Sequence, residues 1–555
     1  MDVANQQQEG ELSPRVKHAV AVAVVLAGLA VAIWLGVRSQ GAFYHDDDIN
    51  HYLFAVKGWN SPLHLWHTWG RPGYTVPTML VAHFFGMAGC RVFSALQMAL
   101  VALLAYLIAR RLGAGWAAVA APVLVWVQPL AMTLSLTTLT ETPAAVYMTL
   151  AVWLLLRGNF VTGCAAASLL FVTRYETAAL APVLLLWVFR DRLKQAQGNW
   201  STALRAKGMW ASAVALAWAP VAYIAISHGF ALPTETSMVY MLLGTPTDEY
   251  GHGTWAHYLE VWPIAAGVGV LALAAAGAVR TPRRTWLPAA LAAGLVALHT
   301  VLFHYGKFAS GGYPRFLVVE CGLVAALAAN GLYVMYQRGS LLAASAAAGV
   351  LYGYVRLLER RAALLWPYVP GTELLNTLTL AAMILLLATV AAWALLAAMP
   401  ARRLRFGVVL LTTAGAIGAI TWQAKLQIRP LKPETDSYRI ACAEAMDYVA
   451  GGEYRDHFAM AGHVLVGFAR PNTYVGGSAH EEMELWEHAA PGTLFFWDNK
   501  FTGPETPEHP RGELYDSLWR LGDRLYCCSW DEAEVEVFIR RGARDTTTTA
   551  RGPGE

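Results

Sequence analysis

Residues 19–37 read AVAVAVVLAGLAVAIWLGV, and this stretch decides the fold class. It holds no charged side chain, and as a helix it is long enough to cross the roughly 30 Å hydrocarbon core of a bilayer. Arg15 and Lys17 precede the run, but no small-residue cleavage pattern follows it. We therefore expect a retained membrane-spanning helix rather than a signal peptide.

Apolar runs of similar length recur along most of the chain. Of the 555 residues, 56% are hydrophobic and only 14% are charged, and the mean hydropathy is +0.40, which excludes an ordinary soluble globular protein. The pattern predicts a polytopic α-helical membrane domain of about thirteen transmembrane helices within residues 1–422. The predicted spans are 19–37, 91–109, 116–131, 142–156, 160–173, 177–189, 209–227, 262–279, 286–304, 314–335, 341–355, 373–397 and 407–422.

Basic residues fall mainly on one side of these predicted spans. With a cytoplasmic N-terminus, most connections rich in Lys and Arg are cytoplasmic too, as the positive-inside rule requires. The exceptions are Arg356, Arg360 and Arg361, which fall on a predicted outer loop. We therefore expect a multi-pass protein of the cytoplasmic (inner) membrane, with outer segments at 38–90, 228–261 and 305–313 and an extracytoplasmic C-terminal region. The net charge of +3 offers no basis for nucleic-acid binding.

The C-terminal region loses the apolar continuity of the membrane part. A helix-like stretch at 438–450 and strand-like stretches at 493–497 and 535–539 predict a small extracytoplasmic α/β domain over 423–544, followed by a disordered tail at 545–555. Oxidation is permitted outside the cytoplasm, so a disulfide from Cys442 to Cys527 or Cys528 is a candidate there.

Three consecutive carboxylates, Asp46, Asp47 and Asp48, open the first predicted outer loop. One interpretation is structural, because an Asp at this point caps an amphipathic surface helix whose apolar residues follow at helical spacing. That interpretation explains one Asp more easily than three, since adjacent carboxylates repel one another unless they share a cation or a proton. The triplet is therefore the first candidate for a functional site.

Several segments, in order and on the predicted side of the membrane, resemble the membrane-embedded C-type glycosyltransferases. These are FYHDDDINHYLFAVKGW at 43–59, WGRPGYTVPTMLVAHFFG at 69–86, YLIARRLG at 106–113, TLTETPAAVYMTLAVWLLLRG at 138–158, RYETAALAPVLLLW at 174–187 and GGYPRFLVVECGLVAALAA at 311–329. The superfamily includes protein O-mannosyltransferases, lipid A aminoarabinose transferases and mycobacterial arabinosyltransferases. The resemblance implies inverting transfer of a sugar from a polyprenyl-phosphate carrier to an acceptor hydroxyl outside the cytoplasmic membrane.

The resemblance also implies roles for the acidic triplet. An inverting displacement needs a base for the acceptor's proton, and a carboxylate in a partly desolvated cleft is suited to that role. The third Asp leaves the register open between Asp47 and Asp48, so the catalytic candidates are Asp46, Asp47 and Asp48, with the adjacent His45 as a substrate-binding candidate. Asp46 and Asp48 are also candidate ligands for Mg²⁺ or Mn²⁺, although metal-independent transfer occurs in the superfamily.

Basic residues at predicted outer helix ends are candidates for binding the donor phosphate, whose charge grows as it leaves. Arg315 and Lys307 fit this role, and the alternative for both is ordinary snorkelling of basic side chains at a helix end. Arg71 either reaches the phosphate or binds a membrane lipid headgroup.

Three further polar residues lie at predicted outer helix ends. Glu141 at the start of one predicted helix is either a site residue or a favourable charge for the helix dipole. Arg174 and Glu176 are either site residues or simply partners of each other.

The competing functional interpretation is a transporter or flippase of lipid-linked sugars, which would place ionisable residues deep in the membrane or show repeat symmetry. A binding domain on a membrane anchor is a third interpretation, but it does not explain so many crossings. Helix interiors nearly free of charge favour the transferase. The sequence leaves open the sugar, hexosyl or pentosyl, and the acceptor, a glycan, lipid or protein.

Overall fold

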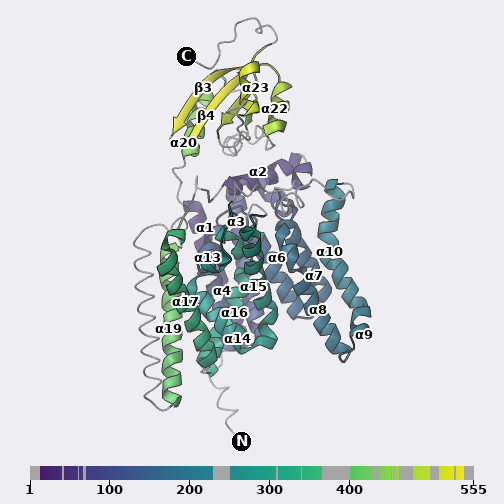
Figure 1. The fold of residues 1–555 in the computed structure, drawn as a ribbon, viewed down its shortest axis with the longest axis vertical. Coiled ribbons are helices and arrows are strands. Elements are labelled where there is room, and N and C mark those ends of the chain that lie inside the picture. Colours follow the sequence, from purple (N-terminus) through teal and green to yellow (C-terminus); the bar gives the residue numbers. More distant parts are fainter. Residues whose placement is uncertain are drawn as a thin grey trace. The chain divides into compact units, whose positions relative to one another are not determined.

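The computed structural model of the chain describes most of the membrane part and much of the C-terminal region. The described residues are 13–39, 43–44, 46–60, 62–66, 70–228, 251–307, 311–338, 341–365, 401–427, 429–431, 437–451, 453–454, 457–461, 479–499, 512–530 and 533–542. They divide into two compact units, one formed by Met1–Gln40 with Leu65–Leu431 and the other by Gly41–His64 with Lys432–Glu555 (Figure 1).

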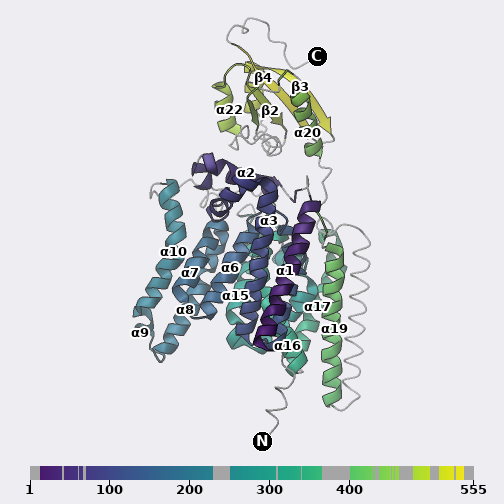
Figure 2. The ribbon, with the colours of Figure 1, turned by 180° about the vertical axis from the view of Figure 1, so that it is seen from behind.

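The first unit is helical. Figures 1 and 2 show its long helices running side by side, with α1 against α3, α6 between α3 and α7, and α14 against α16. Its elements are α1 (Pro14–Arg38), α3 (Pro72–Leu112), η2 (Gly115–Val119), α4 (Ala120–Trp126), α5 (Pro129–Leu134), α6 (Glu141–Leu156), α7 (Phe160–Thr173), η3 (Tyr175–Leu180), α8 (Ala181–Gln195), α9 (Trp200–Arg205), α10 (Lys207–His228), α13 (His257–Ala266), α14 (Val268–Arg280), α15 (Pro282–His304), η5 (Pro314–Glu320), α16 (Cys321–Arg338), α17 (Leu341–Leu365) and α19 (Ala401–Gln427).

Many of these helices coincide with the predicted spans. Within the described residues, five helices are long and apolar enough to cross a membrane, or six if the bent pair α13 and α14 is one span. Shorter apolar helices lie at 115–126, 141–156, 160–173, 342–354 and 407–421. The predicted span 373–397 lies outside the described residues. The chain is therefore a polytopic α-helical membrane protein.

Two helices differ from the predicted spans. The helix α3 begins at Pro72, well before the predicted span 91–109, and continues to Leu112 with a backbone break at Gly86. Polar residues and Pro77 dilute the hydropathy of the first half of α3 and hid it from the sequence analysis. The predicted span 262–279 is also not straight, since α13 and α14 meet at an angle of 106° around Gly267, whose φ of 84° is open to glycine.

Glycines bring α14 and α16 into backbone contact. A Cβ at Gly331 would collide with the carbonyl of Leu273, and a Cβ at Gly277 would collide with the carbonyl of Leu327. Asn330 adds a hydrogen bond across the same contact, because its Nδ2 donates to the carbonyl of Gly277 at 3.0 Å. Small residues allow this close approach of helices in a membrane, where packing rather than water exclusion drives association.

The second unit contains α2 (Asp46–Asn60) and a mixed sheet in the C-terminal region. The strands β1 (Ala459–Ala461), β2 (Leu494–Asp498), β3 (Gly522–Trp530) and β4 (Ala533–Arg540) lie in the order β1-β2-β4-β3, with β1 parallel to β2 and the other pairs antiparallel. Among the described residues, the helices that accompany the sheet are α20 (Ser437–Gly451), α22 (Ala479–Glu487) and α23 (Glu513–Leu521). Its core includes Trp486, Phe495, Trp497 and Phe538, all almost fully buried.

The candidate disulfide of the C-terminal region does not form. No disulfide joins Cys442 to Cys527 or Cys528. The Cys528 thiol instead donates to the carbonyl of Ala441 at 3.2 Å, while the Cys527 side chain is exposed. Cys528 and Cys527 are neighbours on a strand and point to opposite faces, so only Cys528 faces α20.

Candidate functional site

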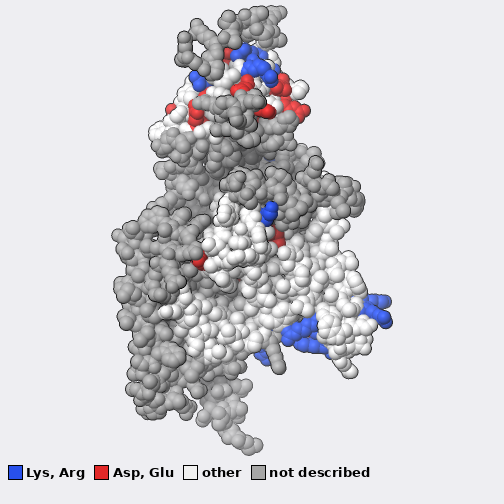
Figure 3. Space-filling model, in the orientation of Figure 1, with Lys and Arg blue, Asp and Glu red and all other residues white. Residues whose placement is uncertain are grey.

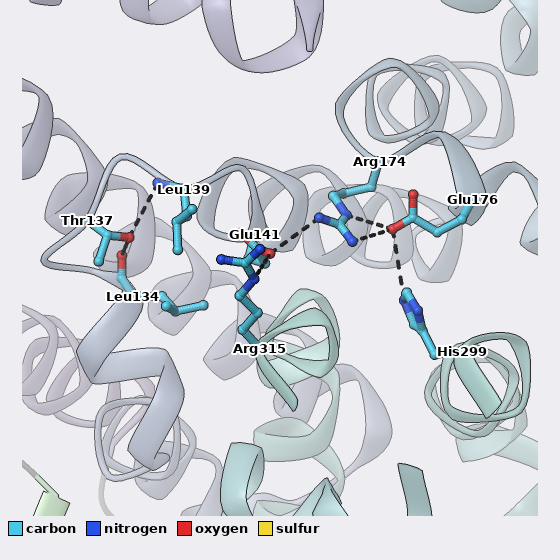
Figure 4. A network of polar contacts seen from close by, with 8 residues as sticks. All are labelled: Leu134, Thr137, Leu139, Glu141, Arg174, Glu176, His299 and Arg315. Carbon is cyan, nitrogen blue, oxygen red and sulfur yellow. Dashed lines mark hydrogen bonds and ion pairs between the residues drawn. The ribbon is translucent and has the colours of Figure 1, made fainter. Parts of the chain in front are cut away.

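Glu141 begins α6 and is almost fully buried. The chain reaches it through a tight turn, in which Thr137 donates its hydroxyl to the carbonyl of Leu134 at 2.8 Å and accepts from the backbone N–H of Leu139 at 3.3 Å (Figure 4). A carboxylate in the first turn of a helix interacts favourably with the helix dipole. Glu141 therefore lies where its charge interacts favourably with the helix dipole. Its side chain also has partners from two other elements.

Arg174 is the first of these partners, and it holds two carboxylates at once. It ends α7 with an extended backbone, and η3 starts directly after it. Its Nε and Nη2 both lie 2.6 Å from Glu176 Oε1, and its Nη1 lies 3.3 Å from Glu141 Oε1. The guanidinium also lies over the ring of Phe316, 4.2 Å from its centroid. Arg174 and Glu176 do pair with each other, and through Glu141 they join a larger network.

Arg315 is the second partner of Glu141. It belongs to η5, which Pro314 starts with a backbone preset for a helical turn. Its Nε lies 3.5 Å from Glu141 Oε1, and its guanidinium packs against the rings of Tyr313 and Phe316. Figure 4 shows Arg315 and Arg174 approaching the same carboxylate from different elements.

Arg71 reaches the same region through a strained turn. Its φ of 61° is rare for a residue with a side chain, and such strain is found most often at functional sites. The turn is held in place, because a Cβ at Gly73 would collide with Thr173 and because Tyr147 donates its hydroxyl to the carbonyl of Gly73 at 3.0 Å. The buried guanidinium of Arg71 lies 4.5 Å from the ring centroid of Tyr175, the neighbour of Glu176.

The sequence analysis missed His299, which extends the network at its other end. His299 lies on α15 and is fully buried, with Nε2 3.9 Å from Glu176 Oε1. Its ring stacks on Phe316 with centroids 5.1 Å apart and lies against Tyr258 at 5.3 Å. A single histidine in an apolar run carries no sequence signal of its own, so only the fold reveals this contact.

Together these residues form a buried chain of alternating charge, in the order Arg315, Glu141, Arg174, Glu176 and His299 (Figure 4). We call it the charge network. Taking ions out of water costs several kcal/mol per ion, and their attraction offsets this only with good geometry. Stability alone is therefore a poor reason for two arginines and two glutamates among apolar helices.

The acidic triplet lies in the other unit, at the start of α2. Asp48 is fully buried and its Oδ2 accepts the backbone N–H of Tyr44 at 3.3 Å, while Asp47 is half-buried. The predicted helix is present, since α2 begins at Asp46 and Asp48 binds the chain that leads into it. Its position at the membrane surface stays a prediction. His45 and the side chain of Asp46 lie outside the described residues.

Two lysines, Lys307 and Lys57, are partly buried. Lys307 lies just after α15, and its backbone N–H donates to the carbonyl of Leu302 at 2.7 Å. Its phosphate role stays a prediction. Lys57 on α2, which the sequence analysis did not name, is partly buried, and this burial lowers the pKa of its ammonium group to about 8.

A search of the described residues for groups able to hold a metal ion finds Cys527, Glu534 and Glu536, in the sheet. Glu536 already accepts the hydroxyl of Tyr515 at 3.1 Å and pairs with Arg524 at 3.3 Å. The predicted Mg²⁺ or Mn²⁺ site at Asp46 and Asp48 stays a prediction, because it includes a side chain beyond the described residues.

Charge is distributed unevenly along the helical unit. Figure 3 shows a broad surface over its helices with few charged residues, and Lys and Arg gathered near α8 and α9. The helix α8 starts directly after η3, which carries Glu176, and ends with Arg192 and Lys194 in its last turn. The charge network and the basic cluster therefore lie at opposite ends of α8.

Comparisons with known proteins agree with this architecture. The family model described as dolichyl-phosphate-mannose-protein mannosyltransferase matches residues 37–173, which include the acidic triplet, Arg71 and Glu141. A search of curated protein sequences gives no match.

Among solved structures, ArnT from Cupriavidus metallidurans bound to undecaprenyl phosphate is 15% identical, with a TM-score of 0.57 over 94% of this chain and 98% of that chain. The same protein in the apo state is 14% identical, with a TM-score of 0.51 over 93% and 97%. At these identities the likeness concerns the fold. The chain is therefore similar to the mannosyltransferase family over residues 37–173 and shares the fold of ArnT.

Proposed function

We propose that the protein is an inverting glycosyltransferase, which moves a sugar from a polyprenyl-phosphate donor to an acceptor hydroxyl on the outer face of the cytoplasmic membrane. The observation that carries this proposal is the charge network, buried within a fold shared with ArnT. Its arginines supply fixed positive charge inside an apolar unit, which is what a departing lipid phosphate requires.

Arg315 is the proposed phosphate ligand. Its Nε lies 3.5 Å from Glu141 Oε1, so its guanidinium belongs to the charge network. A guanidinium presents five N–H donors in a planar fork that matches phosphate geometry. Arg71 is the proposed second cation, since its guanidinium lies over Tyr175, next to Glu176. Lys307 is the proposed third.

Asp47 or Asp48 is the proposed base. A carboxylate that is removed from water without losing access to the acceptor is suited to take a proton, and Asp48 is buried while Asp47 is half-buried. A divalent cation held by Asp46 and Asp48 would share the phosphate charge.

An apolar cavity of about 660 Å³ supports a lipid-linked substrate. It lies among α13, α14, α15, α16 and α17, and Leu271, Leu327 and Tyr354 are among its lining residues. Such a cavity suits a prenyl chain, because burying each methylene contributes about 0.8 kcal/mol.

The proposed orientation has the network facing outward. The basic end of α8 is the end that the positive-inside rule assigns to the cytoplasm, and η3 is at the opposite end. We further propose thirteen crossings and an extracytoplasmic C-terminal domain. Glycans, lipids and proteins are all open as acceptors, and the sugar is a hexose or a pentose.

The test is sugar transfer by the purified full-length protein from a panel of labelled polyprenyl-phosphate donors. We expect Asp47→Asn or Asp48→Asn to lower transfer by about 10²–10⁴-fold, the usual contribution of a general base. We expect Arg315→Gln to lower it by about 10²–10³-fold. Arg520→Gln, an exposed arginine in the C-terminal region, is the matched control.

Full transfer by both Asp variants would overturn the assignment of the base. No transfer from any donor, combined with movement of labelled donor across proteoliposome membranes, would replace the transferase with the alternative, a flippase. The same assay with and without chelator, Mg²⁺ and Mn²⁺ tests the metal.

A further inference from the structure

The two ends of the charge network differ in chemistry. At one end Arg315 provides a cation. At the other end, Glu176 uses a single oxygen, Oε1, for both contacts with Arg174. Its other oxygen, Oε2, and both ring nitrogens of His299 are buried without a hydrogen-bond partner among the described residues. Both side chains are at most 1% exposed.

Orphaned polar atoms in a buried place call for an explanation. Leaving a buried donor or acceptor unsatisfied costs about 1–3 kcal/mol, and native proteins have few of them. Three such atoms on two facing side chains therefore call for a polar partner. The carboxylate oxygen can only accept, and a neutral imidazole offers one donor and one acceptor.

A hydroxyl group fits this set of atoms. It donates one hydrogen bond and accepts others, so it can donate to Glu176 Oε2 and accept from the imidazole N–H. An anion fits poorly, because Arg174 is already shared by two carboxylates and Glu176 would repel it. The network thus has an end for anions at Arg315 and an end for hydroxyls at Glu176 and His299.

We propose that Glu176 and His299 bind hydroxyl groups of the donor sugar while the Arg315 end takes the donor phosphate. This inference rests on the proposed function and deepens it. Glu176 and His299 are specificity residues, and Arg174 is a positioning residue that holds Glu176. A site built to bind a hydroxyl discriminates strongly against a sugar lacking it, because its buried polar groups then stay unpaired.

The ring of His299 is held in place for this role. Phe316 stacks on it and Tyr258 lies against it, from η5 and α13 respectively. Phe316 also lies beneath the guanidinium of Arg174. One aromatic ring therefore ties the position of the imidazole to that of the arginine that orients Glu176, and such preorganisation lowers the entropy lost on binding.

The experiment compares transfer from the parent donor with transfer from donors that each lack one sugar hydroxyl. His299→Phe keeps a ring to stack on Phe316 but removes both nitrogens. We expect it to lower kcat/KM for the parent donor about ten- to a hundred-fold, the loss of a hydrogen bond to a buried polar group. For one deoxy donor the variant and the unaltered protein should be equal, because the hydroxyl that His299 reads is already absent.

Two further variants make the result decisive. His299→Gln restores an amide in place of the ring nitrogens, and we expect it to recover part of the preference for the parent donor even where the Phe variant folds poorly. His304→Phe is the matched control on the same helix, since the His304 Nδ1 binds the carbonyl of Gly253 rather than the network. It should leave the donor preference unchanged.

The outcomes separate this inference from the proposed function. If the unaltered protein transfers sugar but the His299 variants lose the same factor with every donor, His299 binds no hydroxyl of the donor sugar and the inference is wrong. If the unaltered protein transfers no sugar at all, the proposed function fails and the inference falls with it. A penalty that disappears for one deoxy donor supports both.

Discussion

Arg174 in the helical unit and Arg520 in the C-terminal region make the same kind of contact in opposite surroundings. Each places a guanidinium on a glutamate, Arg174 on Glu176 and Arg520 on Glu487. The side chains of the first pair are 6% and 0% exposed, whereas those of the second are 63% and 37% exposed. Their chemistry is equal, and only the solvent differs.

The difference shows that the energetic contribution of a salt bridge depends on its exposure to solvent. An exposed ion pair contributes about 0–1 kcal/mol, because water and salt screen the charges. A buried pair costs desolvation and stabilises little overall, yet removing one partner is strongly destabilising. The presence of the exposed pair therefore needs no functional explanation. The presence of the buried pair does need one, such as the proposed binding of a charged and hydroxylated substrate.

The largest expected effect is that of Arg174→Met. Removing the shared cation leaves Glu141 and Glu176 buried without it, and we expect a loss of about 3–5 kcal/mol. The measurement is the thermal unfolding midpoint in detergent. Adding Glu176→Gln to the same chain should restore part of the loss, since one buried charge is removed as well. An unchanged midpoint for Arg174→Met would show that water reaches the network and that burial is not its defining property.

Glu536→Leu tests an intermediate case, a buried carboxylate in the C-terminal sheet paired with a half-exposed arginine. The hydroxyl of Tyr515 would lose its acceptor, so we expect destabilisation of about 1–3 kcal/mol. Denaturant unfolding followed by the fluorescence of the sheet's tryptophans measures it, with Glu534→Leu as the neighbouring control. A loss as large as that of Arg174→Met would erase the distinction between the two regions.

Lys57 tests partial burial of a cation by pH. Its pKa in the folded protein is about 8, against about 10.4 in an unfolded chain. Because the unfolded state then binds more protons between these values, stability should rise as pH increases from about 8 to about 10.4. Lys57→Met should remove this rise.

Amine labelling read by mass spectrometry checks the same shift directly. Lys57 should react with a half-maximal rate near pH 8. A titration near pH 10.4 would mean that water solvates Lys57 as freely as a surface residue.

The smallest expected effect is that of Arg520→Gln. The pair with Glu487 is open to solvent, so we expect a change within about 0.5 kcal/mol, fading further at high salt. The unfolding midpoint at low and high ionic strength measures it. A loss above about 1 kcal/mol would mean that solvent exposure does not explain the difference in stability between the two ion pairs. The argument that the buried network needs a functional explanation would then be weaker.

Sequence reasoning located most helices well, because membrane spans are long apolar segments that can be recognised from local hydropathy alone. The predicted runs 142–156 and 160–173 coincide with α6 and α7. It missed the first half of α3, where polar residues interrupt the apolar run without ending the helix. It also missed the bend at Gly267, where a single glycine interrupts an otherwise continuous apolar run.

Candidate site residues were only partly predictable. Glu141, Arg174, Glu176 and Arg315 attracted attention as polar residues at helix ends, and the fold brings them together. Arg71, also a candidate from the sequence, lies over the ring of Tyr175, the neighbour of Glu176. His299 gave no signal, since one histidine in an apolar helix looks the same whether it packs or binds.

The sequence by itself determined that this chain crosses a membrane several times, which residues are apolar enough to do so, and which segments resemble the membrane-embedded C-type glycosyltransferases. Hydropathy and helical periodicity are local properties, so a single chain reveals them. Only the tertiary structure decided that Arg315 meets Glu141, that Arg174 is shared by two carboxylates and that His299 completes the line. Those contacts join segments far apart in the chain, and the energy of a charge depends on which neighbours and how little water surround it.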